Sequence, residues 1–498
     1  MVTHSVSAPS HPFKAHLQWA TFDWKRAERW VYRLQRRIAK ATVERRFNKV
    51  KVLQRLLTKS FYARMLAVRQ VTSNKGKHTP GVDKEVWSES YQKGLAANKL
   101  SKVGYKPQPL RRIYIPKKNG KIRPLSIPTM RDRAMQALFL LALNPVAETT
   151  ADRDSFGFRQ YRSAHDALQK CYCNLASKGK AQWILEADIK SCFDEISHEW
   201  ILNNIPIDKQ ILKRWLKSGY VEDGTLFDAS AGTPQGGIIS PVICNMVLDG
   251  LQQTVNNHKG VKKCVNFIRY ADDFIVTGNS PETLKEIQQD IEKFLAERGL
   301  ALSKEKTKIT HINEGFDFLG FNIRKYNGKY LSKPSKDNVK KFCSEIKSTI
   351  KKYNGGNAEQ IIKTLNPKLT GWANYYRSSC AKSTFSYIDN VLFGALLRWV
   401  KRRFNTTSLR QAVGKHFRNQ GDARRWVFSS KQSNGKYLSL HLMMNTRIKR
   451  HALIRLDANP YLNEWEQYYI DRKRNYAFKA ELDKFELTER KSSVTQMQ

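Results

Sequence analysis

The segment from Phe267 to Val276 constrains the fold more than any other part of the chain. It reads Phe-Ile-Arg-Tyr-Ala-Asp-Asp-Phe-Ile-Val, so two adjacent carboxylates, Asp272 and Asp273, stand between two runs of strand-forming residues. This pattern predicts a tight hairpin that presents both acids at its tip. Adjacent carboxylates repel each other, and a divalent cation relieves that repulsion. The segment therefore indicates a metal site; the simpler interpretation is an exposed acidic turn.

A further acid, Asp188, ends a second strand-like run that begins at Trp183. Two-metal phosphoryl transfer needs carboxylates from separate strands, which hold two ions about 3.5–4 Å apart. Asp188 together with Asp272 and Asp273 supplies this set if the two strands are neighbours. Whether they are neighbours is a question for the structure.

The charge of the chain points to a polyanionic partner. Its 498 residues include 88 Lys and Arg against 44 Asp and Glu, a formal charge of +44. Two blocks are especially basic: Lys25 to Arg69 holds 15 Lys and Arg, and Arg398 to Arg455 holds another 15. Such a surplus destabilises a compact chain unless a polyanion lies against it. Nucleic acid is the partner that we expect, and a solvated basic surface or anionic lipid is the alternative.

Several protein classes are excluded by composition. The longest apolar run, Ala137–Leu143, is far shorter than the roughly 20 residues of a membrane span. The segment Met1–Pro12 has no signal-peptide core, and seven scattered cysteines form no disulfide framework. Cys171 and Cys173 are an isolated pair, which favours core cysteines over a zinc site. We expect no membrane association and a reducing compartment, such as the bacterial cytoplasm and nucleoid or an organelle.

Hydrophobic spacing divides the chain into helical and mixed regions. Apolar residues recur about every four positions through the first basic block, which predicts helix. Short strand-like and helical runs then alternate from Arg111 to about Ile323, and three amphipathic helices follow the break at Lys333–Ser335. The predicted divisions are a basic helical extension over 1–75, a mixed α/β region over 76–330, a helical unit over 331–430 and a short basic tail over 431–498.

A series of short motifs runs through most of the chain. The motifs are Arg112–Lys118 with Lys121–Leu125, Ser155–Arg159, Asp188–Asp194, Gly232–Gly237, Tyr270–Asp273, Gly299–Leu302 before Lys306, and Phe318–Phe321. In these motifs and their order the chain resembles the reverse transcriptases encoded by group II introns, which are also maturases. The resemblance implies an α/β plus all-α, right-hand polymerase, in which fingers and a palm with an antiparallel sheet precede a three-helix thumb/maturase domain and a short basic C-terminal region.

The resemblance also implies the metal site. Asp188, Asp272 and Asp273 would be the catalytic acids that hold two Mg²⁺ ions, with the backbone carbonyl of Ile189 as an extra ligand. Lys306 matches a lysine that protonates the departing pyrophosphate, although it could equally be one more surface lysine.

The same resemblance implies the nucleotide contacts. Phe193 matches the aromatic residue under the incoming sugar, where a ring excludes a 2′-hydroxyl; otherwise it would be an ordinary core residue. Gln235 matches the glutamine that contacts the deoxynucleoside triphosphate (dNTP), on a glycine-flanked loop that can approach a ligand closely. Lys121 and Arg123 match the basic pair that holds the triphosphate.

The helical unit carries a further family motif, Leu369–Arg377, which resembles the maturase region of the intron proteins. Its plainer interpretation is an aromatic core of the thumb. The resemblance implies that this unit and the N-terminal block bind intron RNA, which is recognised through shape, phosphates and 2′-hydroxyls. The arginines that we expect at this RNA are Arg36, Arg37, Arg45, Arg46, Arg377, Arg402 and Arg403.

The C-terminal region is the part in which family members differ. The stretch from Ile448 to Tyr461 resembles the one that leads into a DNA-binding and endonuclease region. The last cysteine is Cys380 and the last histidine is His451, so we expect no Cys/His-supported HNH endonuclease.

The expected function is RNA-directed DNA polymerisation together with binding of the group II intron RNA, promotion of its splicing and its reverse transcription at a DNA target during retrohoming. One alternative is a splicing-only maturase whose polymerase site is inactive. Another is a retron or defence-type reverse transcriptase, and a third is a DNA-templated polymerase.

Overall fold

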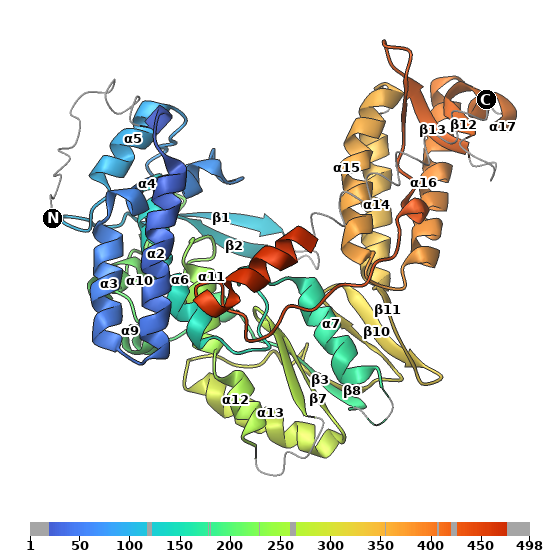
Figure 1. Cartoon of the computed structure of the whole chain (residues 1–498). Coiled ribbons are helices and arrows are strands. Elements are labelled where there is room, and N and C mark those ends of the chain that lie inside the picture. Colours follow the sequence, from blue (N-terminus) through green and yellow to red (C-terminus); the bar gives the residue numbers. More distant parts are fainter. Residues whose placement is uncertain are drawn as a thin grey trace. The chain divides into compact units, whose positions relative to one another are not determined.

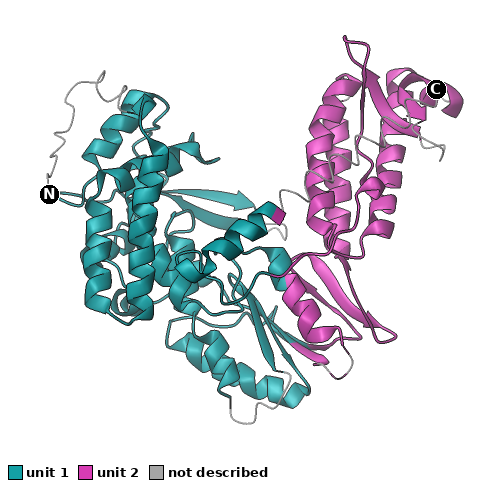
Figure 2. Cartoon of the chain, in the orientation of Figure 1, with its two compact units in different colours: residues 1–167, 185–309, 454–474 teal, residues 168–184, 310–453, 475–498 magenta. Residues whose placement is uncertain are grey.

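The computed structural model describes residues 19–116, 122–177, 179, 181–228, 230–258, 265–353, 355–405, 408–419 and 426–475. The chain folds into two compact units (Figure 2). Unit 1 comprises 1–167, 185–309 and 454–474, and unit 2 comprises 168–184, 310–453 and 475–498. The fold is mixed α/β with antiparallel strand pairs, as the alternating pattern predicts.

The first helices of unit 1 surround one long buried helix. Asp23 caps the first of them by accepting a hydrogen bond from the Arg26 backbone N–H at 2.9 Å, and Thr129 caps the buried one in the same way. The buried helix, α6, packs against α2, α3 and α4 (Figure 1). The helices are α2 (Trp24–Val43), α3 (Phe47–Lys59), α4 (Phe61–Ser73), α5 (Ser90–Lys99) and α6 (Met130–Thr150).

The sequence pattern of the first basic block predicts helix, and the block forms three helices. Leu34 and Ile38 of the predicted apolar stripe are buried on α2, and Leu53 and Leu57 continue the buried face on α3. The basic residues take the opposite faces, because a helix in contact with a core on one side leaves its other side to water.

Two four-stranded sheets lie in the α/β region. The first has the order β2-β1-β4-β5 and is built from β1 (Leu110–Pro116), β2 (Ile122–Ile127), β4 (Tyr220–Glu222) and β5 (Thr225–Phe227). The second has the order β6-β7-β3-β8 and is built from β3 (Trp183–Asp188), β6 (Asn266–Tyr270), β7 (Asp273–Gly278) and β8 (Lys308–His311). The second sheet contains the predicted acidic hairpin, since β6 and β7 pair antiparallel with Tyr270 opposite Asp273.

Helices of this region cover and connect the sheets. They are α7 (Ala164–Leu175), α8 (Cys192–Glu195), α9 (His198–Asn204), α10 (Lys209–Leu216), α11 (Ser240–Leu248), α12 (Leu251–Asn256) and α13 (Pro281–Ala296). Ser280 caps α13, and Pro281 occupies its first turn, where the missing N–H is not needed.

Unit 2 combines two small sheets with three long helices. Its elements are β9 (Phe316–Phe318), β10 (Phe321–Tyr326), β11 (Lys329–Pro334), α14 (Lys336–Lys352), α15 (Ala358–Tyr376), α16 (Lys382–Arg403), α17 (Leu409–His416), β12 (Phe417–Asn419), β13 (Trp426–Lys431) and β14 (Tyr437–Ser439). The Leu369–Arg377 motif lies in and just after α15. Its Trp372 stacks on Phe342 of α14, with ring centroids 4.9 Å apart, and its Tyr376 is buried, so this motif builds core between the helices.

Residues 454–474 return to unit 1 after the chain has passed through unit 2. The Tyr32 hydroxyl of α2 donates to the Pro460 carbonyl at 2.7 Å, and the Asp166 carboxylate accepts from the Ile454 N–H at 2.9 Å. Tyr461, within this segment, is buried. The part of the predicted basic tail that the structure describes therefore includes a stretch docked on unit 1. Within the described residues, no helix is both long and apolar enough to cross a membrane.

Candidate active site

The hairpin between β6 and β7 turns in two residues and carries its acids at the tip. Tyr270 pairs with Asp273, which leaves Ala271 and Asp272 as the turn. Ala271 has φ of 59°, a left-handed conformation that disfavours any residue with a Cβ by about 1–2 kcal/mol. A two-residue hairpin needs such a conformation at a central position. The backbone of the turn is therefore locally strained.

Asp188 lies at the end of the strand next to this hairpin. It is the last residue of β3, which neighbours β7 in the sheet. Because β3 and β7 are neighbours, Asp188 lies close enough to Asp273 to raise the pKa of that carboxyl, after the larger effects of burial and of Asp272. The sequence left open whether the two strands are neighbours, and in the structure they are.

The environment of Asp272 and Asp273 disfavours the charged forms of both side chains. Burial raises the pKa of Asp273 well above its ordinary value, and repulsion from Asp272 and Asp188 raises it further. Burial also raises the pKa of Asp272, and Asp188 adds to the effect. A cation bound beside these acids would offset their mutual repulsion.

Two basic side chains face the acids. Lys306 Nζ forms an ion pair with Asp188, and this hydrogen bond raises the pKa of Lys306. Burial raises the pKa of Asp272, and the positive charge of Arg123, on β2, offsets part of this rise. Lys121, the other half of the predicted triphosphate pair, lies outside the described residues.

The backbone around Asp188 is held on its other side by residues 301–303. The Lys190 N–H donates to the Ala301 carbonyl at 2.9 Å, and the Ser303 N–H donates to the Asp188 carbonyl at 2.8 Å. Ile189, the predicted carbonyl ligand, forms an antiparallel bridge with Leu302 and is buried. This bridge also brings Lys306 to Asp188.

The predicted nucleotide contacts share one loop system. Phe193 is half-buried on α8, and its carbonyl accepts from the Thr233 N–H at 2.6 Å. Gln235 Nε2 donates to Asp194 Oδ2 at 2.7 Å, while its carbonyl accepts from the Ser126 N–H of β2 at 2.8 Å. Gly232 has φ of 82°, and a Cβ there would lie 2.5 Å from the Asp194 carbonyl, so this loop needs glycine to lie against α8.

The predicted RNA-binding arginines lie in both units and differ in their surroundings. Arg37 is exposed on α2, Arg45 is exposed with φ of 54°, and Arg46 pairs with Glu44 at 3.3 Å. Arg36 Nε instead donates to Asn463 Oδ1 at 2.6 Å, and its guanidinium pairs with Glu466 at 3.2 Å. Arg36 is thus bound to the C-terminal segment 454–474. In unit 2, Arg402 and Arg403 are exposed at the end of α16, and Arg377 is half-buried after α15.

The sequence prediction missed two sets of residues. Arg29 and Arg33 are exposed on α2 at four-residue steps before Arg37, a spacing that the sequence contains and that places them on one face. Arg269, Asn245 and Asp249 form a buried polar cluster behind the acidic turn, and nothing local in the sequence signals that they meet.

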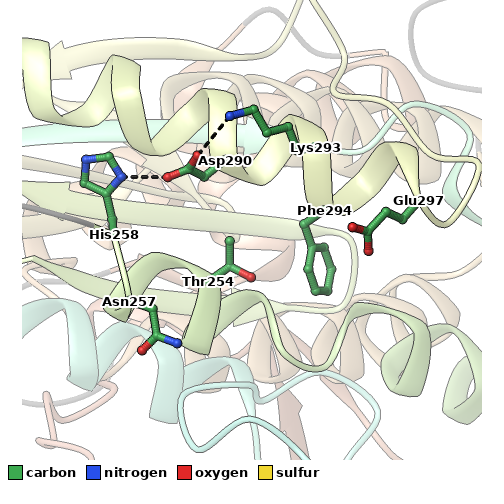
Figure 3. A pocket seen from close by; sticks show the side chains of 7 residues that line it. All are labelled: Thr254, Asn257, His258, Asp290, Lys293, Phe294 and Glu297. Carbon is green, nitrogen blue, oxygen red and sulfur yellow. Dashed lines mark hydrogen bonds and ion pairs between the residues drawn. The ribbon is translucent and has the colours of Figure 1, made fainter.

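A separate hollow of about 560 Å³ lies between α12 and α13, lined by Thr254, Asn257, His258, Asp290, Lys293, Phe294 and Glu297 (Figure 3). His258 Nδ1 contacts Asp290 at 2.6 Å, and Lys293 pairs with the same carboxylate at 3.5 Å. None of the predicted site residues lines it. Its charged groups largely neutralise one another, which suits a surface ion-pair cluster.

Family models match three consecutive parts of the chain. The model described as reverse transcriptase (RNA-dependent DNA polymerase) matches residues 115–323, the N-terminal domain of reverse transcriptase matches 19–100, and the group II intron maturase-specific domain matches 339–417.

Individual proteins are similar as well. Protein YkfC of Escherichia coli is 31% identical over 344 residues, which cover 60% of this chain and 90% of YkfC. The group II intron-encoded protein LtrA of Lactococcus lactis is 27% identical over 445 residues, which cover 69% of this chain and 73% of LtrA. A solved telomerase from Candida albicans is 13% identical with a TM-score of 0.37, and the match covers 63% of this chain and 62% of the telomerase.

The sheet with its acidic turn, together with the match over 115–323, defines the chain as a reverse transcriptase by class. Within that class, the match to the maturase-specific domain and the similarity to YkfC and LtrA identify the family. The chain belongs to the family of group II intron reverse transcriptase/maturases.

Proposed function

We propose that this chain is an active RNA-directed DNA polymerase that also binds a group II intron RNA and promotes its splicing. The observation that carries the proposal is the convergence of Asp188, Asp272 and Asp273 at one end of the β6-β7-β3-β8 sheet. Two-metal phosphoryl transfer needs this donor set from separate strands.

The acids fit two Mg²⁺ ions by their chemistry. Mg²⁺ prefers carboxylate oxygens, and bound ions would offset the burial and the mutual repulsion that raise the pKa values of Asp272 and Asp273. Among the described residues, no group of three His, Cys, Asp or Glu side chains forms a ready-made metal cage. Mg²⁺ commonly binds to one or two carboxylates and completes its shell with water and substrate phosphates. Bound there, the ions would activate the primer 3′-oxygen and neutralise charge on the leaving pyrophosphate.

The remaining residues act on the dNTP. Arg123 faces the acids from β2 and would neutralise the triphosphate as charge moves toward the pyrophosphate. Lys306, which forms an ion pair with Asp188, would give a proton to the leaving pyrophosphate, since a lysine is protonated at neutral pH. Phe193 would lie under the sugar and exclude a 2′-hydroxyl, and Gln235 would contact the bound nucleotide from the adjoining loop.

The architecture supports the polymerase proposal in its parts. We assign the palm to the sheet with the acids, the fingers to the β1–β2 hairpin and its helices, and the thumb/maturase domain to α14, α15 and α16. Family membership and the exposed arginines of both units support RNA binding and maturase function. Reverse transcription at a DNA target during retrohoming is the further step that the same membership suggests.

Primer extension tests the proposal directly. Purified protein, an RNA template with an annealed DNA primer, dNTPs and Mg²⁺ should give extension, and Asp272→Ala should give none. Binding of the intron RNA should be equal in the two proteins. If neither protein extends the primer but both bind the RNA, the chain is a splicing-only maturase and the polymerase proposal is wrong.

A further inference from the structure

A fully buried arginine stands directly behind the acidic turn. Arg269 is the β6 residue before Tyr270, and its side chain has an exposed fraction of 0%. Its guanidinium forms an ion pair with Asp249 and donates a hydrogen bond to Asn245 Oδ1 at 3.2 Å. A buried guanidinium is unfavourable unless charge and hydrogen bonds compensate it, so its partners are held closely to it.

Asn245 links this cluster to a separate loop. Its Nδ2 donates to the Gly157 carbonyl at 2.8 Å. The loop also runs along β6, because the Arg269 N–H donates to the Asp154 carbonyl and the Phe156 N–H donates to the Arg269 carbonyl, both at 2.9 Å. The loop is therefore fixed to Arg269 through its backbone and through the side chain of Asn245.

Gly157 brings this loop into contact with the turn itself. A Cβ built on Gly157 would lie 2.4 Å from the Ala271 backbone nitrogen and 3.0 Å from the Tyr270 carbonyl carbon. Backbone atoms cannot move aside as a flexible side chain does, so any side chain at this position would displace the turn. Gly157 has no positive φ, so the need for glycine here is one of space alone.

The turn needs such support because it is strained. Ala271 adopts φ of 59°, and the three acids repel one another. A disfavoured backbone conformation persists only where surrounding structure determines it.

We propose that Gly157, Asn245, Asp249 and Arg269 are positioning residues that hold Asp272 and Asp273 in the geometry required for metal binding and phosphoryl transfer. We call these four residues the brace. None of them has to contact the substrate. The brace acts on the acids through the backbone of Tyr270 and Ala271. This inference rests on the proposed polymerase function and adds to it the residues that set the position of its metal site.

Gly157→Ala tests the brace, with Gly414→Ala as its matched control. Gly414 is exposed on α17, and a Cβ there would meet nothing within 4 Å. A displacement of the acids by 1 Å is expected to lower kcat by about a hundredfold, because reacting groups tolerate little misplacement. The KM for dNTP and the affinity for RNA should stay within about threefold of wild type, and Gly414→Ala should match wild type in all of these.

Asp249→Asn is a second variant, which changes charge and leaves shape nearly intact. Its control is Asp457→Asn, at an exposed Arg–Asp pair with Arg153 Nε at 2.6 Å. Because asparagine carries no negative charge, Arg269 loses its counter-charge and the turn becomes less well fixed. We expect a loss in kcat in the same direction as for Gly157→Ala, and no loss for Asp457→Asn.

Binding of Mn²⁺ to the full chain, followed by the electron paramagnetic resonance signal of free Mn²⁺, supplies a readout independent of catalysis. Each brace variant should bind Mn²⁺ several-fold more weakly than wild type at a temperature where circular dichroism shows it folded. A merely structural role would leave Mn²⁺ affinity and kcat unchanged at that temperature, and this result would overturn the inference. If wild type binds Mn²⁺ but extends no primer, the polymerase proposal fails, while weaker Mn²⁺ binding by the brace variants still supports the brace.

Discussion

The acidic turn and the basic face of α2 are both charged parts of unit 1, but they differ in the spacing and the burial of their charges. The acids are crowded, their pKa values are raised, and buried residues surround them. Arg29, Arg33 and Arg37 are spread along an exposed helical face. Catalysis by the crowded acids depends on their exact placement. Each of the dispersed arginines instead adds a separate increment to the free energy of RNA binding through counterion release. We therefore expect substitutions in the first region to abolish activity and substitutions in the second to weaken binding in steps.

After Asp272→Ala, the largest expected effect belongs to Asp188→Asn. This variant removes the carboxylate that lies beside Asp273 and pairs with Lys306. We expect kcat for primer extension to fall by about 10³-fold. Single-turnover incorporation of one dNTP measures it. Glu199→Gln, an acid exposed on α9, is the control and should retain full activity. Activity of Asp188→Asn within tenfold of wild type would contradict the assigned metal site.

The adjacent residues Arg36 and Arg37 give a smaller and more selective effect. Arg37→Gln should weaken intron RNA binding a few-fold and reduce the slope of log Kd against log salt by about one, as expected for one lost phosphate contact. Arg36→Gln should leave that slope unchanged and lower the Tm, because Arg36 is paired with Asn463 and Glu466. Filter binding over a salt series and thermal unfolding measure the two quantities. Equal salt slopes for both variants and wild type would show that Arg37 makes no phosphate contact.

Arg36 and Arg37 also show how much can be predicted from the sequence. The hairpin, its acids and the buried stripe of α2 follow from spacing, because strands alternate with period 2 and helices repeat every 3.6 residues. The distinction between Arg36 and Arg37 does not follow, since the partner of Arg36 lies 427 residues later in the chain.

The brace was beyond prediction for the same reason. Arg269 meets Asp249 and Asn245, which are 20 and 24 residues away on another element, and their contact depends on how α11 packs behind β6. Gly157 lies still further off, in a motif that family resemblance had marked without any physical role. Long-range packing decides these contacts, and local patterns carry no signal for them.

Crowding of the acids predicts a modest effect on stability. The pKa of Asp273 is raised in the folded state, so the folded chain binds more protons than the unfolded chain above the usual value of about 4. Stability therefore falls as pH rises from there through the raised pKa. At pH 8, Asp273→Asn should raise the Tm of the metal-free protein by about 2 °C, and the gain should disappear near pH 4.

Mg²⁺ supplies the complementary measurement for the same acids. It should raise the Tm of wild type at pH 8 more than that of Asp273→Asn, since the variant has less repulsion to relieve. Differential scanning fluorimetry with and without Mg²⁺ measures both proteins, and Glu199→Gln should behave as wild type. An equal response of all three proteins to Mg²⁺ would argue against metal binding at the turn.

The smallest expected effect concerns the acids that already have cationic partners, in the hollow between α12 and α13 (Figure 3). His258 Nδ1 and Nε2 lie 2.6 Å from Asp290 and 3.2 Å from Glu286, and the hydrogen bond to Asp290 is the main cause of its raised pKa.

A raised histidine pKa stabilises the fold below the unfolded value of about 6.5, and this contribution disappears as pH rises through the folded value. His258→Gln should therefore lower the Tm by about 1 °C at pH 6 and by less at pH 8.5, because its partner Glu286 is exposed and ion pairs near the surface contribute little. His198 provides a control of opposite sign, since burial lowers its pKa and its Nε2 lies 2.8 Å from the Gly232 carbonyl oxygen. The Tm loss for His198→Gln should be larger at pH 8.5 than at pH 6. If the two variants follow the same pH trend, the ion pairs of His258 do not stabilise the fold, and the contrast between paired and crowded acids fails at this cluster.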